Sequence, residues 1–184
     1  MVGHSQGTTQ TFAGMGLIPE WYDENVSVAA LMGPCTTPNQ KYFGDMYTQE
    51  NWDFLQENNI YVIAGPNWEA DRAKIMADGP EILKTSIAGL EHLMNNPIQA
   101  AAAYAQTSMS SRFQRYTEEK VWWGQEHYPE AKHHSELMDY GLVKDMKVAM
   151  YVGLFDDTCP LVESQKIYED LGEFTAFHWV VAPW

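Results

Sequence analysis

The chain has 184 residues, of which 45% are apolar, and its formal net charge is −14. This length allows one domain with an apolar core, and no run approaches the roughly 20 apolar residues that span a bilayer. Because contacts with phosphates need clustered Lys and Arg, the acidic balance argues against nucleic acid as a partner. A solvated surface explains the charge, and so does adaptation to an acidic compartment.

The N-terminal part of the chain predicts alternating helix and strand. Residues 6–15 predict a helix directly after Ser5, with two glycines at its end. The nearly continuous apolar run 26–32, closed by a Gly-Pro pair, is typical of a strand buried on both faces. The shorter run 60–64 fits either a strand or another buried segment.

Between about residues 36 and 141 tryptophan, tyrosine and methionine are dense and helical periods appear. Asp78 and Pro80 predict the start of one helix. Its apolar face is predicted to contain Ile82, Leu83, Ile87, Leu90 and Leu93.

Pro97 is expected to open the next helix, which runs through residues 100–105 toward Phe113. Residues 118–135 have no clean period and indicate a loop. The loop contains His127, His133 and His134. No carboxylate or cysteine completes a ligand spacing with these histidines, so we expect no metal.

The C-terminal part predicts strand, helix and strand. Residues 146–152 form an apolar run, Pro160 opens a helix that Gly172 closes, and residues 175–182 predict a last strand. The side chains of this helix that are expected to face the core are Leu161, Val162, Ile167, Tyr168 and Leu171. Strands and helices in this order imply a parallel sheet with crossover helices, so we expect an α/β fold.

The segment GHSQG near the N-terminus fits the G-x-S-x-G pattern of a nucleophile elbow, a tight turn from strand to helix. Ser5 would be the nucleophile, flanked by His4 on the same turn. Gly3 and Gly7 would let the neighbouring backbone approach without a Cβ clash. The helix N-terminus favours developing negative charge, and the backbone N–H of Gln6 is the expected oxyanion donor.

An acid is expected after a later strand, because the triad in this fold follows the order serine, acid, histidine. Asp156 lies three residues past Gly153, at the carboxyl end of the predicted 146–152 strand. Catalytic groups gather at that end of parallel sheets. Asp157 is adjacent and stays open as an alternative, with capping of the following helix as its structural interpretation.

A histidine should activate the serine, but none is placed to do so. His178 is the only histidine after Asp156, and it falls inside a predicted strand rather than in a loop. We interpret it as structural, and His4 as a packing residue of the elbow. No motif indicates a cofactor.

The two cysteines, Cys35 and Cys159, match no metal-binding spacing and do not amount to a disulfide framework. One sequon, at residues 25–27, is compatible with secretion.

These motifs resemble the acid lipases of the gastric and lysosomal type, a family of α/β-hydrolases. Residues 1–9 (MVGHSQGTT) are similar to the family's elbow G-H-S-Q-G-T. Residues 147–161 resemble the strand and loop that carry its acid, with Asp156 in register. Residues 30–34 resemble the family's next strand, and residues 106–117 resemble a segment late in its inserted cap.

The resemblance implies an α/β-hydrolase core over residues 1–35 and 142–184, with a helical cap inserted over residues 36–141. It implies hydrolysis of neutral lipid esters such as triacylglycerols or steryl esters. It also implies transient contact with lipid surfaces through the cap, no cofactor, and a secreted or lysosomal location.

By the same register the catalytic histidine follows shortly beyond Trp184, and the strands that precede the elbow are missing. We therefore expect a fragment truncated at both ends and inactive alone. Two alternatives remain: another carboxylesterase or thioesterase on this fold, and a non-catalytic hydrolase fold that serves binding.

Overall fold

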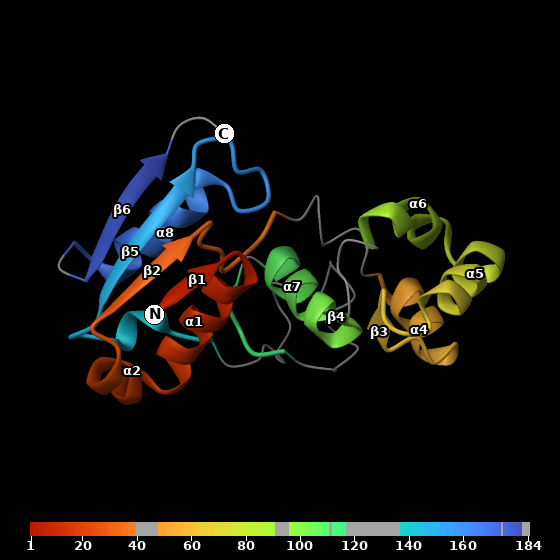
Figure 1. Ribbon diagram of the computed structural model, residues 1–184, viewed down its shortest axis with the longest axis horizontal. Helices are drawn as coiled ribbons and strands as arrows, with labels where there is room; N and C mark the ends of the chain where they lie inside the picture. Colours follow the sequence, from red (N-terminus) through yellow and green to blue (C-terminus); the bar gives the residue numbers. More distant parts are fainter. Residues whose placement is uncertain (40–47, 91–95, 111, 117–136, 174, 182–184) are drawn as a thin grey trace. The chain divides into compact units, whose positions relative to one another are not determined.

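The computed structural model describes residues 1–39, 48–90, 96–110, 112–116, 137–173 and 175–181 (Figure 1). The chain divides into two compact units. The first comprises residues 1–39, 111–115 and 136–184, and the second comprises residues 40–110 and 116–135. The segments 36–39, 111–115 and 136–141, which the sequence assigns to the cap, therefore belong to the first unit.

A four-stranded parallel sheet organises the first unit, with strand order β1-β2-β5-β6. The strands are β1 (Val2–His4), β2 (Val28–Met32), β5 (Lys147–Gly153) and β6 (Ala176–Val181). His4 aligns with Met32, and Met32 with Tyr151, so the carboxyl ends of neighbouring strands meet at one edge. The predicted α/β class with a parallel sheet is confirmed.

Helices cover one face of this sheet (Figure 1). They are α1 (Gln6–Leu17), α2 (Pro19–Asn25) and α8 (Leu161–Leu171), with the short 3₁₀ helix η3 (Tyr140–Leu142) beside them. Alternate residues of β5 enter the core, because side chains of a strand point to opposite faces. The core combines Phe12 and Met15 of α1, Ile167 and Leu171 of α8, and Leu31, Val148, Met150 and Val152 of the sheet.

The opposite face of the sheet is apolar but uncovered by the described residues. Val28 on β2 is 49% exposed and Phe177 on β6 is 55% exposed, and Met32 and Tyr151 are exposed beside them. Parallel sheets are ordinarily covered on both faces, which is why their strands are apolar throughout. The prediction that the 26–32 strand is buried on both faces is therefore wrong for the described part of the chain.

Two glycines of α1 do not end the helix, contrary to the prediction. A Cβ at Gly14 would collide with the ring of Tyr22, and one at Gly16 would lie 2.8 Å from the backbone nitrogen of Asp139. The glycines let α2 and the segment before η3 approach α1 closely, and the helix continues to Leu17.

The helix predicted after Pro160 is confirmed, but its inward stripe differs at one position. Val162 is 74% exposed, whereas Ser164 is fully buried and donates to the carbonyl of Leu161 at 2.8 Å. Ser164 lies in the helical period of Ile167 and Leu171, and Val162 lies outside it. At these two positions the place in the helical period, and not the apolar or polar residue type, decides which side chain is buried.

The second unit contains α4 (Gln49–Glu57), β3 (Val62–Ile63), α5 (Trp68–Asp78), α6 (Glu81–Leu90), β4 (Asn96–Pro97) and α7 (Ile98–Ser110). β3 and β4 pair antiparallel, so the 60–64 run contains a short strand. An apolar core joins these elements, and its larger buried residues are Trp52, Leu55, Ile60, Ile63, Ile75, Leu83, Ile87 and Ile98.

Leu83 and Ile87 are buried on α6 as predicted, but Asp78 ends α5 instead of starting α6. Leu93 and the predicted loop 118–135 lie outside the described residues. Helix α7 ends before Phe113, whose ring instead lies 5.9 Å from that of Tyr140 in the first unit. None of the described helices is long and apolar enough to cross a bilayer.

One carboxylate fastens α2 to the segment that enters β5. Asp23 Oδ1 accepts the backbone N–H groups of Lys144, Asp145 and Met146 at 3.0, 2.9 and 3.1 Å. Partial burial raises the pKa of Asp23, but the three backbone donors and the charge of Lys144 outweigh burial and hold the pKa below its usual value.

We predict that Asp23→Asn destabilises the first unit by roughly 1–3 kcal/mol at neutral pH, the range for hydrogen bonds to a charged group. Because the folded pKa of Asp23 is depressed, its contribution is present above the unfolded pKa, near 3.8, and is lost as pH falls through the folded pKa. Urea unfolding at several pH values measures this. The exposed Glu24→Gln on the same helix is the control, and equal stabilities of the two variants would contradict the prediction.

Candidate active site

Ser5 occupies the turn between β1 and α1, at the carboxyl edge of the sheet. Its backbone lies at φ 51° and ψ −119°, a region that residues with a Cβ rarely adopt. Such strain persists only where the surroundings enforce it. Here Ser5 N–H donates to the carbonyl of Met32 at 3.0 Å, and the Ser5 carbonyl accepts the N–H of Thr8 at 2.8 Å. This is the tight strand-to-helix turn that a nucleophile elbow requires.

The hydroxyl of Ser5 has no structural task among the described residues. Serine is favoured at helix N-termini because its oxygen usually accepts an N–H of the first turn. Ser5 stands at the N-cap of α1 but makes no such bond, and it is exposed. Neither capping nor backbone preference accounts for serine here, and its hydroxyl is free to meet a substrate.

The two elbow glycines differ in what they permit. A Cβ at Gly3 would lie 3.0 Å from the carbonyl oxygen of Gly7 and 3.1 Å from Leu31 Cδ2, whereas a Cβ at Gly7 would enter open space. The close approach predicted for both residues therefore holds at Gly3 only. As the first residue of α1, Gln6 has no acceptor for its N–H inside the helix, so this donor is available to an oxyanion.

Asp156 lies in the loop between β5 and α8, at the same edge as Ser5. Its Oδ1 accepts the backbone N–H of Thr158 at 3.1 Å and of Cys159 at 2.9 Å. Oδ2 points toward Gly33, where a Cβ added to the glycine would lie 3.7 Å from it. This oxygen accepts no hydrogen bond among the described residues. One oxygen is thus anchored and the other can accept a further donor.

The neighbouring Asp157 is exposed and uses its backbone differently. Its carbonyl accepts the side-chain amide of Asn39 at 3.2 Å. Helix α8 has Pro160 at its N-cap and no side-chain capping bond, so the interpretation of Asp157 as a helix cap is corrected.

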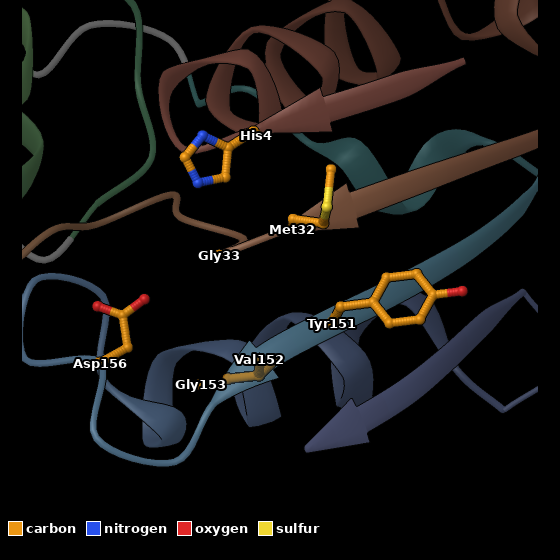
Figure 2. A pocket seen from close by; sticks show the side chains of 7 residues that line it. All are labelled: His4, Met32, Gly33, Tyr151, Val152, Gly153 and Asp156. Atoms are coloured by element: carbon orange, nitrogen blue, oxygen red, sulfur yellow. The ribbon is translucent and has the colours of Figure 1, made fainter. Parts of the chain in front are cut away.

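A half-open cavity of about 520 Å³ lies at this edge of the first unit (Figure 2). His4 enters it from the end of β1 and Asp156 from the loop after β5, with the backbone of Gly33 between them. Met32, Tyr151 and Val152 supply apolar side chains to its wall. His4 is exposed and faces the cavity, whereas the sequence analysis interpreted it as a packing residue of the elbow.

No histidine side chain is hydrogen-bonded to Ser5 or Asp156 among the described residues. His178 is the third residue of β6 and aligns with Met150, so its predicted mid-strand place is confirmed. The histidines at 127, 133 and 134 lie outside the described residues. Within the described ranges no group of three or more His, Cys, Asp or Glu side chains could hold a metal ion.

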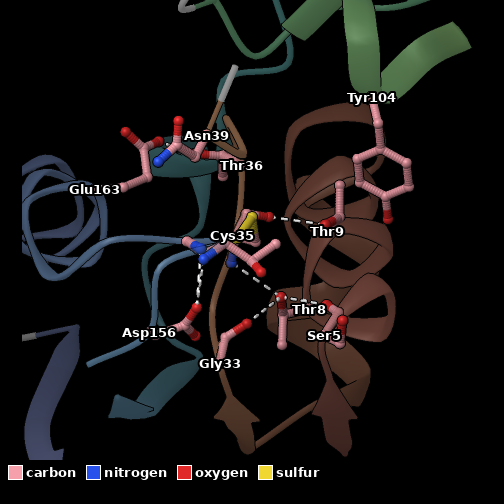
Figure 3. Close-up of a disulfide and its surroundings, with 12 residues drawn as sticks. Ser5, Thr8, Thr9, Gly33, Cys35, Thr36, Asn39, Tyr104, Asp156 and Glu163 are labelled. Atoms are coloured by element: carbon pink, nitrogen blue, oxygen red, sulfur yellow. Dashed lines mark hydrogen bonds between the residues drawn. A yellow bond between two sulfur atoms is a disulfide. The ribbon is translucent and has the colours of Figure 1, made fainter. Parts of the chain in front are cut away.

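A disulfide that was not predicted joins Cys35 and Cys159, whose Cα atoms are 5.5 Å apart (Figure 3). The cysteines are 124 residues apart in the chain, so their spacing carried no signal. A signal did exist in their positions, because each follows one of two adjacent parallel strands within a few residues. Loops after adjacent parallel strands emerge at the same edge.

No protein-family model matches this chain, and no curated protein is significantly similar in sequence. The residues and their geometry therefore carry the functional argument.

The elbow geometry predicts opposite outcomes for its two glycines. Gly3→Ala should destabilise the first unit by roughly 1–3 kcal/mol, because the new methyl group has to displace the α1 backbone or Leu31. Gly7→Ala should leave stability unchanged or raise it by at most about 1 kcal/mol, since alanine is the better helix former. Thermal and urea unfolding of the two variants measures the difference. Equal effects would show that the turn is looser than described.

Proposed function

We propose that this protein is a serine hydrolase of carboxylic esters, with Ser5 as nucleophile. The observation that carries the proposal is that Ser5 is exposed, has its backbone at φ 51°, and makes no capping hydrogen bond with its hydroxyl. A strained backbone at a serine whose hydroxyl has no structural partner is best explained by a catalytic role of that hydroxyl. The first N–H groups of α1 would hold the oxyanion of the tetrahedral intermediate.

Asp156 is proposed as the acid that orients the base. Its anchored Oδ1 fixes the carboxylate, while Oδ2 stays open to the N–H of an imidazole. Asp157 lies outside the cavity lining, which favours Asp156. Strand β2 lies between the strands that lead into the two turns. At ordinary strand spacing β1 and β5 are therefore about 10 Å apart, which leaves room for an imidazole between Ser5 and Asp156. The proposal assigns the base to a histidine outside the described residues.

The resemblance to acid lipases extends the proposal to neutral lipid esters as substrates. The apolar wall around His4 and Asp156 supports an apolar acyl or alcohol group. A disulfide supports an oxidising compartment outside the cytosol, in agreement with a secreted or lysosomal location. A carboxylesterase or thioesterase would use the same residues, so hydrolysis of long-chain esters against short-chain esters and thioesters separates these activities.

The proposal predicts that a fluorophosphonate probe labels Ser5 in the polypeptide that the gene encodes. Ser5→Ala should abolish labelling and ester hydrolysis. Asp156→Asn should slow both by roughly three to four orders of magnitude, because the base loses its orientation. Asp157→Asn, the matched control, should retain near wild-type rates. Peptide mass spectrometry locates the label.

A folded protein that neither labels nor hydrolyses esters would contradict the proposal and leave the non-catalytic hydrolase fold.

A further inference from the structure

The hydroxyl of Thr8 ties the elbow to the loop after β2. It donates to the Ser5 carbonyl at 2.6 Å and accepts the backbone N–H of Cys35 at 3.1 Å (Figure 3). Thr8 is fully buried, so solvent does not compete for these bonds. A second threonine on the same helix, Thr9, donates to the Cys35 carbonyl at 2.8 Å. Cys35 thus has both backbone groups bound to the first turn of α1.

The disulfide then joins Cys35 to the loop that carries Asp156. Cys159, its partner, donates the backbone N–H that Asp156 Oδ1 accepts at 2.9 Å. A continuous path therefore runs from the Ser5 carbonyl through Thr8, Cys35 and Cys159 to the Asp156 carboxylate. Every step in it is a covalent bond or a hydrogen bond of the first unit.

We propose that Thr8 and the Cys35–Cys159 disulfide are positioning groups that fix Asp156 relative to Ser5. The inference rests on the proposed hydrolase function and adds residues to its machinery. Ser5 and Asp156 belong to turns after β1 and β5, and these strands are not neighbours because β2 lies between them, so no hydrogen bond of the sheet joins the two turns directly. The loop after β2 lies between the two turns and is bonded to both.

Further bonds from the loop after β2, one to the loop after β5 and one to helix α8, restrict how much the disulfide can contribute. The Asn39 N–H donates to the Thr158 carbonyl at 2.8 Å, and the Thr36 hydroxyl donates to Glu163. Loss of the disulfide should therefore loosen Asp156 without releasing its loop. A misplacement of about 1 Å slows catalysis up to roughly a hundredfold, so we expect a ten- to hundredfold loss.

The experiment measures the rate at which a fluorophosphonate labels Ser5 in the full gene product across pH, with melting temperatures recorded in parallel. The variants are Cys35→Ala/Cys159→Ala, Thr8→Val and Thr8→Ser. Both disruptive variants should slow labelling ten- to hundredfold. They should also lower the midpoint of its pH profile, because a loosened Asp156 stabilises the protonated base less. Thr8→Ser keeps the hydroxyl and should restore both values.

Thr11→Val is the matched control. Thr11 is also a buried threonine of α1, but its hydroxyl donates at 2.8 Å to the Gly7 carbonyl within the helix. It should leave the pH midpoint unchanged even if stability falls. Dithiothreitol, which reduces the disulfide to two thiols, should reproduce the double-cysteine effect in the wild type and change nothing in the double variant.

The outcomes separate the two proposals. Wild-type labelling with unchanged rates and midpoints in the double-cysteine variant and in Thr8→Val overturns the positioning role and leaves the hydrolase proposal intact. Failure of Ser5 to label in the folded, oxidised wild type overturns both. Slower labelling with a shifted midpoint, rescued by Thr8→Ser, supports the positioning role, since a merely structural residue would not move the midpoint.

Discussion

The strained turn at Ser5 is the constraint on which the carboxyl edge of this protein depends. A positive φ at a residue with a Cβ costs of the order of 1–3 kcal/mol, and neighbouring contacts must offset that cost. The β2 carbonyl of Met32 fixes the nitrogen of the turn, and Thr8 fixes its carbonyl. Gly3 lets the strand pass close to α1. The turn therefore exists because three separate segments meet there.

The parallel sheet explains why these segments meet. In a parallel sheet all strands end at one edge, so the loops after β1, β2 and β5 emerge side by side whatever their distance in sequence. One face of the sheet carries the crossover helices and a continuous core. The other face keeps apolar residues such as Val28 and Phe177 in the open. The strands thus carry the composition of a sheet covered on both sides, while the described residues cover one.

Sequence reasoning anticipated the features that depend on local pattern. Apolar runs indicated the strands, and Gly172, at φ 77°, correctly marked the end of α8 because such a conformation favours glycine. The elbow was visible for the same reason: its residues are contiguous. Features that depend on distant partners were not visible. Gly14 and Gly16 looked like helix ends, and only the positions of Tyr22 and Asp139 show that they serve close packing. The disulfide was missed because the sequence shows only that Cys35 and Cys159 each follow a strand, whereas their pairing depends on β2 and β5 being neighbours in the sheet.

The kinds of interaction that hold the first unit together determine how the candidate site would behave in acid. A chain with a net charge of −14 at pH 7 repels itself least near its isoelectric point, at about pH 4.6, so mild acid relieves one source of instability. Acid also threatens folds whose carboxylates hold the structure together. Here the carboxylate of Asp23, which binds the segment before β5, has a depressed pKa and therefore stays ionised at a lower pH than an ordinary aspartate. The links between the elbow and the Asp156 loop are a disulfide and neutral hydrogen bonds from threonines and backbone groups, which do not titrate in acid. The connection between the elbow and this loop would therefore retain its geometry at a pH where ion pairs would fail, because no ionised group takes part in it.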